Sequence, residues 1–118
     1  MKVNVLGTEY TITEKKYNEE EAFERRSISG YCDGYTKEIV YCDMHTYKGW
    51  EHESEATIIE CNKQILRHEI VHAFFNESGL NECSFVCNGA WARNEEMVDW
   101  IADQSPKIIK AFKEAGCL

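Results

Sequence analysis

The feature that most constrains the fold is an apolar stretch near the middle of the chain that carries three polar side chains. Its apolar members fall on nearly every side of a helical wheel; they are Ile58, Ile59, Ile65, Leu66, Ile70, Val71, Ala73, Phe74 and Phe75. A helix that is apolar all round lies at the centre of a domain. His68, Glu69 and His72 interrupt this stretch. Because an unpaired buried polar group costs free energy, these three side chains need partners.

Local signals place both ends of this helix. Ser54 suits the N-cap, and Glu55 adds an acidic residue to the first turn. Gly79 suits the left-handed position just after a helix C-terminus. The sequence therefore predicts a helix from near Ser54 to near Ser78.

The residues before this helix favour strands. Residues 3–12 alternate apolar and polar side chains around Gly7, which predicts a hairpin. Residues 28–43 predict two more short strands around a turn at 34–37, because their Ile, Val and Tyr residues favour β structure. Residues 14–27 predict a loop or short helix, and 43–53 a polar and aromatic loop.

Two further helices are predicted after the central one. The first covers about 90–104, and the second about 106–116, because Ser105 can cap a helix and Pro106 fits its first position. The whole order predicts an α+β domain. It has a small, mainly antiparallel sheet, a central helix and two further helices.

Composition bounds the class of protein. A chain of 118 residues fits a single domain, 1–118. The formal net charge of −8 and the absence of a basic stripe predict no direct nucleic-acid binding. No apolar run is long enough for a membrane span, and the first residues alternate like a strand rather than a signal peptide. We therefore expect a cytoplasmic protein whose six cysteines are reduced thiols, with metal binding by some of them left open.

His68 and His72 are four residues apart, so both point the same way from a helix. Glu69 lies about 100° away on the same turn. This is the geometry of the HExxH motif, in which two imidazoles bind Zn²⁺ and the glutamate is the general base. Chance occurrence of the three residues at this spacing is the alternative.

A catalytic zinc site needs a third protein ligand. Glu95 and Asp99 lie four apart on the predicted helix 90–104. The wheel places Glu95 at the margin of its inner face and Glu96 nearly opposite; that face is formed by Trp91, Val98, Ile101 and Ala102. Glu95 is thus the predicted ligand, and Asp99 is predicted to orient a ligand histidine. The alternative is an acidic, solvated first turn.

Trp100 falls on the outer side of this helix. It either binds a partner or packs beneath the N-terminal strands. Packing is favoured, because tryptophan is usually well buried.

"HEIVH" followed by "NEEMVD" resembles the gluzincin branch of zinc metallopeptidases. The matching residues are His68, Glu69, His72, Asn94, Glu95 and Asp99. More broadly, residues 54–104 resemble small HExxH proteins of phages and mobile elements, which are similar to peptidases that cleave phage-type repressors. The resemblance implies a zincin-like fold, zinc ligands His68, His72 and Glu95, general base Glu69 and Asp99 behind the ligands. It also implies that the strand before the zinc helix, here 38–42, is a sheet edge that pairs with the substrate backbone.

The expected reaction is zinc-dependent hydrolysis of a protein or peptide substrate, with Glu69 activating a zinc-bound water. The side chain that steadies the oxyanion stays open among five candidates: Tyr31, Tyr35, Tyr41, His45 and His52. A catalytically silent, zinc-stabilised interaction module of a phage or mobile element is the alternative function. Glu69 distinguishes the enzyme from the interaction module, because a structural zinc site needs no base beside the metal. A metal-dependent nuclease is disfavoured by the acidic charge.

Overall fold

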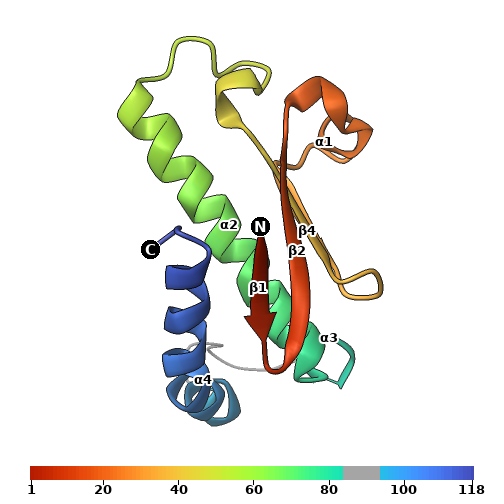
Figure 1. Ribbon diagram of the computed structural model, residues 1–118, viewed down its shortest axis with the longest axis vertical. Coiled ribbons are helices and arrows are strands. Elements are labelled where there is room, and N and C mark those ends of the chain that lie inside the picture. Colours follow the sequence, from red (N-terminus) through yellow and green to blue (C-terminus); the bar gives the residue numbers. More distant parts are fainter. Residues whose placement is uncertain (84–93) are drawn as a thin grey trace.

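Four strands form one mixed sheet in the order β1-β2-β4-β3 (Figure 1). This computed structural model describes residues 1–83 and 94–118. The strands are β1 (Lys2–Val5), β2 (Thr8–Lys15), β3 (Gly30–Asp33) and β4 (Glu38–Cys42). The β1–β2 and β3–β4 pairs are antiparallel, whereas β2 and β4 run parallel. The α+β class is confirmed, and the sheet is mixed.

The predicted first hairpin is present. Leu6 and Gly7 form its turn with φ of 52° and 93°. Positive φ at both central residues gives the two-residue turn that matches the twist of paired strands. The side chains of Val3, Val5, Tyr10 and Ile12 are buried beneath this hairpin.

The prediction that residues 38–42 form an edge of the sheet is wrong. β4 lies between β2 and β3, and the two edges are β1 and β3. Neighbouring Ile39 and Val40 point to opposite faces and are 0% and 4% exposed. Both faces of β4 are thus covered, as expected for an interior strand. The connection from β2 to β3 contains a 3₁₀ turn, η1 (Tyr17–Glu19), and a short helix, α1 (Glu21–Arg25). This segment is long enough for the chain to pass the position of β4, which lies between the two strands.

The central helix, α2 (Glu55–Glu77), has the predicted ends. The Ser54 hydroxyl accepts a hydrogen bond from the Thr57 amide at 3.2 Å, and Gly79 takes a φ of 75°.

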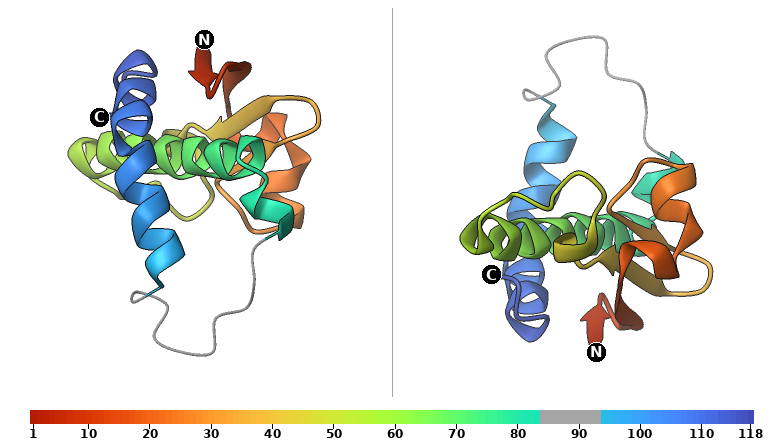
Figure 2. Two further views of the ribbon diagram at one scale, coloured as in Figure 1. Left: turned by 90° about the horizontal axis from the view of Figure 1, so that it is seen from below. Right: turned by 90° about the horizontal axis from the view of Figure 1, so that it is seen from above.

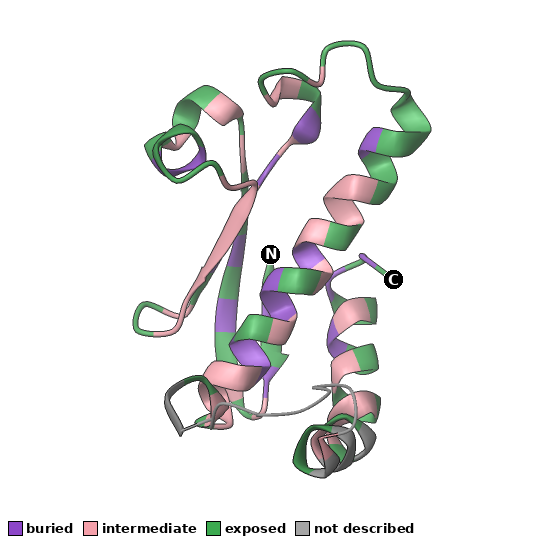
Figure 3. Ribbon diagram, turned by 180° about the vertical axis from the view of Figure 1, so that it is seen from behind, coloured by how far each residue is buried: buried purple, intermediate pink, exposed green. Residues whose placement is uncertain are grey.

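The prediction that α2 is buried on every side is wrong, because Ile59, His68 and His72 are exposed and only Glu69 of the three polar residues is buried. The side of α2 toward the sheet is buried (Figure 3); it consists of Leu66, Ile70, Ala73 and Phe74. A short helix, α3 (Leu80–Cys83), follows.

The last helix, α4 (Glu95–Glu114), is continuous, so the prediction of two helices separated at Ser105-Pro106 is wrong. Residues 90–93 of the predicted first helix lie outside the described residues. α4 crosses α2 (Figure 2). One apolar stripe on both sides of the proline packs against the main core; it contains Trp100, Ile108, Ala111, Phe112 and Ala115. Burial of this stripe offsets the hydrogen bond that Pro106 cannot donate.

In the described part of the chain, neither long helix has the length and apolar character needed to span a bilayer.

Candidate metal centre and groove

His68 and His72 project from adjacent turns of α2 and converge. Their rings meet edge to face with centroids 4.8 Å apart, and their Nε2 atoms are 3.1 Å apart. Two imidazole nitrogens bound tetrahedrally to one zinc ion lie about 3.3 Å apart, given Zn–N bonds of about 2.05 Å. Reduced solvation and the neighbouring His68 lower the pKa of His72, which favours the neutral ring that binds metals. The spacing of the two nitrogens is that of two zinc ligands, and it is also that of a hydrogen bond between the two rings.

Glu69 is buried beside this pair. Its side chain is 6% exposed, and it forms no hydrogen bond or ion pair with the residues that the structure describes. Burial raises the pKa of Glu69 to about 7, and the positive charge of Arg26 acts in the opposite direction. A carboxyl group with this pKa can accept and release a proton near neutral pH.

Gly30 of the edge strand makes room for this carboxyl group. A Cβ atom at Gly30 would lie 3.1 Å from Oε1 of Glu69 and 2.9 Å from Cγ2 of Ile65. Gly34, after the same strand, faces Asn76 in the same way, with 2.9 Å to its side chain. Glycine at both positions lets β3 approach α2 closely, so β3 forms one wall of the site.

A groove runs between β3 and α2 on both sides of the HExxH residues. It consists of two adjoining cavities of about 970 and 480 Å³. Both are lined by Gly30, His68 and Glu69. The larger cavity continues to a charged end that includes Arg25, Arg26, Asp33 and Lys37. The smaller one ends in an apolar wall of Met44, Tyr47, Trp50, Cys61 and Ile65.

The structure narrows the choice among the five candidates for the side chain that stabilises the oxyanion. Tyr31 and Tyr35 line the larger cavity, whereas Tyr41 packs against the main core. Neither cavity is lined by His45 or His52. Tyr31 is the more firmly placed of the two tyrosines, because its hydroxyl donates to Glu20 at 3.4 Å and Tyr35 is 92% exposed.

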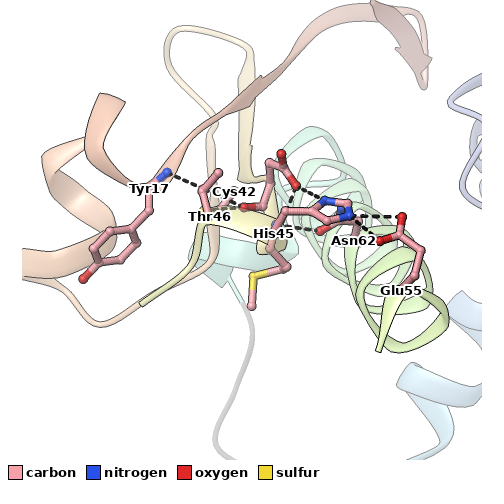
Figure 4. A network of polar contacts seen from close by, with 8 residues as sticks. Tyr17, Cys42, His45, Thr46, Glu55 and Asn62 are labelled. Atoms are coloured by element: carbon pink, nitrogen blue, oxygen red, sulfur yellow. Dashed lines mark hydrogen bonds and ion pairs between the residues drawn. The ribbon is translucent and has the colours of Figure 1, made fainter. Parts of the chain in front are cut away.

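His45 instead belongs to a polar network that joins the 3₁₀ turn η2 (Met44–Thr46) to the first half of α2 (Figure 4). Its Nδ1 lies 2.7 Å from Asp43 and its Nε2 lies 2.9 Å from Glu55. These two carboxylates raise the pKa of His45. The amide of Met44 donates to Asn62 at 3.1 Å, a second link between η2 and α2. His45 therefore has a structural role.

The third ligand remains a prediction. The side chains of Glu95 and Asp99 lie outside the described part of the structure, as does Trp91. Among the side chains that are described, no three His, Cys, Asp or Glu residues gather as a metal-binding group.

The predicted inner face of this helix is wrong where it can be checked. Ile101 is 49% exposed, while Trp100 packs on Phe75 of α2 with ring centroids 4.8 Å apart. The packing of Trp100 is thus confirmed. Glu96 is exposed and lies one turn before Trp100, on the side of α4 that meets α2. The choice of Glu95 over Glu96 therefore needs a direct test.

Sequence reasoning missed Gly30 and Arg26, and it left open whether Cys32, which also lines the larger cavity, binds a metal. Glycine at the start of a strand is a signal of close backbone approach. The adjacent arginines in "FERRS" carried no motif, and only the packing of α1 brings them to the groove. Burial raises the pKa of the Cys32 thiol to about 12, with a further contribution from Glu69, so this thiol stays protonated.

Comparison with known proteins gives no relative. No protein-family model matches the chain, and no curated protein or solved structure matches it. The site must therefore be interpreted from its own geometry.

Proposed function

We propose that this chain is a minimal zincin-like domain that hydrolyses peptide bonds with zinc. The observation that carries the proposal is the environment of Glu69. A buried carboxyl group without a hydrogen-bond partner in the described chain lies beside two converging imidazoles and lines an open groove. Structural carboxylates are normally paired, whereas a general base needs a free oxygen and a pKa near the working pH.

His68 and His72 would hold the metal through Nε2, with Glu95 as the proposed third ligand and Asp99 behind the histidines. A bound zinc ion would polarise the substrate carbonyl and make water a better nucleophile. Glu69 would take the proton of the attacking water at its carboxylate and deliver it to the leaving amine. Tyr31 and Tyr35, which line the larger cavity, are the two candidates for the donor to the oxyanion, and Tyr31 would have to exchange its hydrogen bond to Glu20 for this role.

The substrate is proposed to lie along β3 rather than along residues 38–42. β3 pairs on one side with β4 and is an edge strand of the sheet. An extended peptide can add to such an edge through main-chain hydrogen bonds. Because Gly30 and Gly34 bring β3 close to α2, a peptide on this edge would pass His68 and Glu69.

Metal analysis and turnover together test the proposal. Purified protein should contain about one zinc per chain, and His68→Ala or His72→Ala should lose it. Glu95→Ala should also lose zinc, while Glu96→Ala, a matched change on the next residue, should retain it. Loss in Glu96→Ala alone would show that Glu96 is the ligand.

Glu69→Gln should retain zinc but lose peptide hydrolysis by several orders of magnitude. The substrates to try first are phage-type repressors, which the family resemblance suggests. If the protein binds zinc but wild type and Glu69→Gln do not differ in cleavage of any substrate, a zinc-stabilised interaction module becomes the better account. Full zinc occupancy in the double histidine variant would rule out the metal site itself.

A further inference from the structure

The charged end of the groove holds two arginines that form no ion pair with the described residues. Arg25 and Arg26 line the larger cavity together with His68 and Glu69. Their guanidinium groups form no ion pair or hydrogen bond with the described part of the chain, and both residues are exposed. Glu69 on this wall forms no hydrogen bond in the described chain, although the charge of Arg26 acts on it.

The remaining charged groups on the wall have partners. Glu20 pairs with Lys15 at 2.7 Å, and Lys37 pairs with Glu77. Asp33 accepts hydrogen bonds from the amides of the turn that follows it, at 2.8 and 3.1 Å. The two arginines therefore present donors that a ligand in the groove can use.

The arginines stand on an anchored element. Phe23 of α1 is 0% exposed and packs in the second core cluster with Val40, Cys42, Met44 and Ile58. The amide of Arg26 caps α1 by donating to the carbonyl of Ala22 at 3.0 Å. A binding group on a fixed backbone loses less entropy when it engages a ligand.

We propose that Arg25 and Arg26 select a peptide that carries a carboxylate on the α1 side of the histidine pair. This inference rests on the proposed function, since it assumes that a peptide occupies the groove. Guanidinium groups match carboxylate geometry and bind it through paired hydrogen bonds. The carboxylate belongs either to an Asp or Glu side chain or to the C-terminus of the peptide.

Binding to the Glu69→Gln variant tests this inference without turnover. The probe is a library of randomised decapeptides in two forms, with free and with amidated C-termini. Retained peptides are identified by mass spectrometry, and one matched Glu and Gln pair is then titrated. We expect about fivefold tighter binding of the acidic peptide, the upper range for an exposed ion pair, and a smaller difference at high salt. If acidic peptides are also preferred in the amidated library, the recognised carboxylate is an Asp or Glu side chain. If the preference is confined to peptides with free termini, it is the C-terminal carboxylate.

Charge reversal provides the variant and its control. In the Glu69→Gln background, Arg26→Glu should lose the acidic preference and favour Lys or Arg instead. Lys48→Glu makes the same change of charge at an exposed loop residue outside both cavities and should keep the acidic preference. Arg25→Gln and Arg26→Gln, which remove charge without reversing it, cover the case in which Arg26→Glu does not fold.

The outcomes separate the two proposals. Equal binding of Glu and Gln peptides overturns the charge selection even if wild type cleaves both. An acidic preference that Arg26→Glu reverses supports the selection even if wild type cleaves neither, and in that case the hydrolase proposal fails alone. If Lys48→Glu abolishes the acidic preference as fully as Arg26→Glu does, the preference is an effect of net charge. The assignment to these arginines is then overturned.

Discussion

Glu69→Gln should stabilise the metal-free protein at alkaline pH while removing its proposed general base. The carboxyl group is 6% exposed and its pKa is raised to about 7. Because the folded pKa lies above the unfolded value, the folded state binds the proton more tightly. The contribution of protonated Glu69 to stability is complete below the unfolded pKa and is lost as the pH rises through about 7.

The size of the effect follows from that shift. The pKa rises from 4.5 to about 7, and each unit corresponds to about 1.4 kcal/mol. Ionised Glu69 therefore costs the folded state about 3 kcal/mol at pH 8. Glutamine has the same size and stays neutral, so it avoids this cost. Both neutral forms leave a polar group without a partner, and that penalty cancels in the comparison.

Urea unfolding in the presence of a chelator, at pH 5 and pH 8, measures the effect. The stability difference between Glu69→Gln and wild type should grow by about 2.5 kcal/mol over this range. Glu60→Gln changes the same group at an exposed position of α2 and should not change the pH dependence to a comparable degree. If Glu69→Gln and wild type respond to pH in parallel, the carboxyl group is not held as the structure has it.

Two further predictions concern the contacts that hold α2 in place. Glu77→Ala should lower the free energy of unfolding by about 2–4 kcal/mol, because it leaves the buried Tyr10 hydroxyl and Lys37 without their partner; a loss below about 1 kcal/mol in urea titrations would contradict this. His45→Gln should reduce thermal stability at pH 5.5 more than at pH 9, because Asp43 and Glu55 raise the pKa of His45 and its stabilising charge is lost as the pH rises through that value. An equal reduction at both pH values would show that the charge of His45 contributes nothing.

The ends of α2 could be predicted because they depend on neighbouring residues alone. Ser54 meets its Thr57 partner within one turn, and Gly79 only has to take a left-handed conformation. The convergence of His68 and His72 is equally local, since helical spacing sets it. The first hairpin was predictable for the same reason, because its two-residue turn fixes the register.

The errors concern contacts between distant segments. The parallel pairing of β2 with β4 depends on where the chain returns after α1, which no local pattern specifies. Pro106 is an ordinary helix start by local rules, yet the stripe that includes Trp100 and Ile108 binds one continuous helix to the core. The face of that helix was misassigned because it depends on the position of α2. Arg26 reaches the groove through the packing of α1, so its position there could not be foreseen either.

The environment of Glu69 also bears on the choice between an enzyme and a static zinc module. A structural zinc site is closed by a fourth ligand, and its supporting side chains are hydrogen-bonded. A buried carboxyl group without a partner in the described chain adds nothing to such a site and costs about 3 kcal/mol when ionised. Such local conflicts with stability are expected where a group must exchange protons. Glu69 also lines both cavities of the groove beside β3, and this access is a second reason for proposing an enzyme rather than a permanently closed metal site.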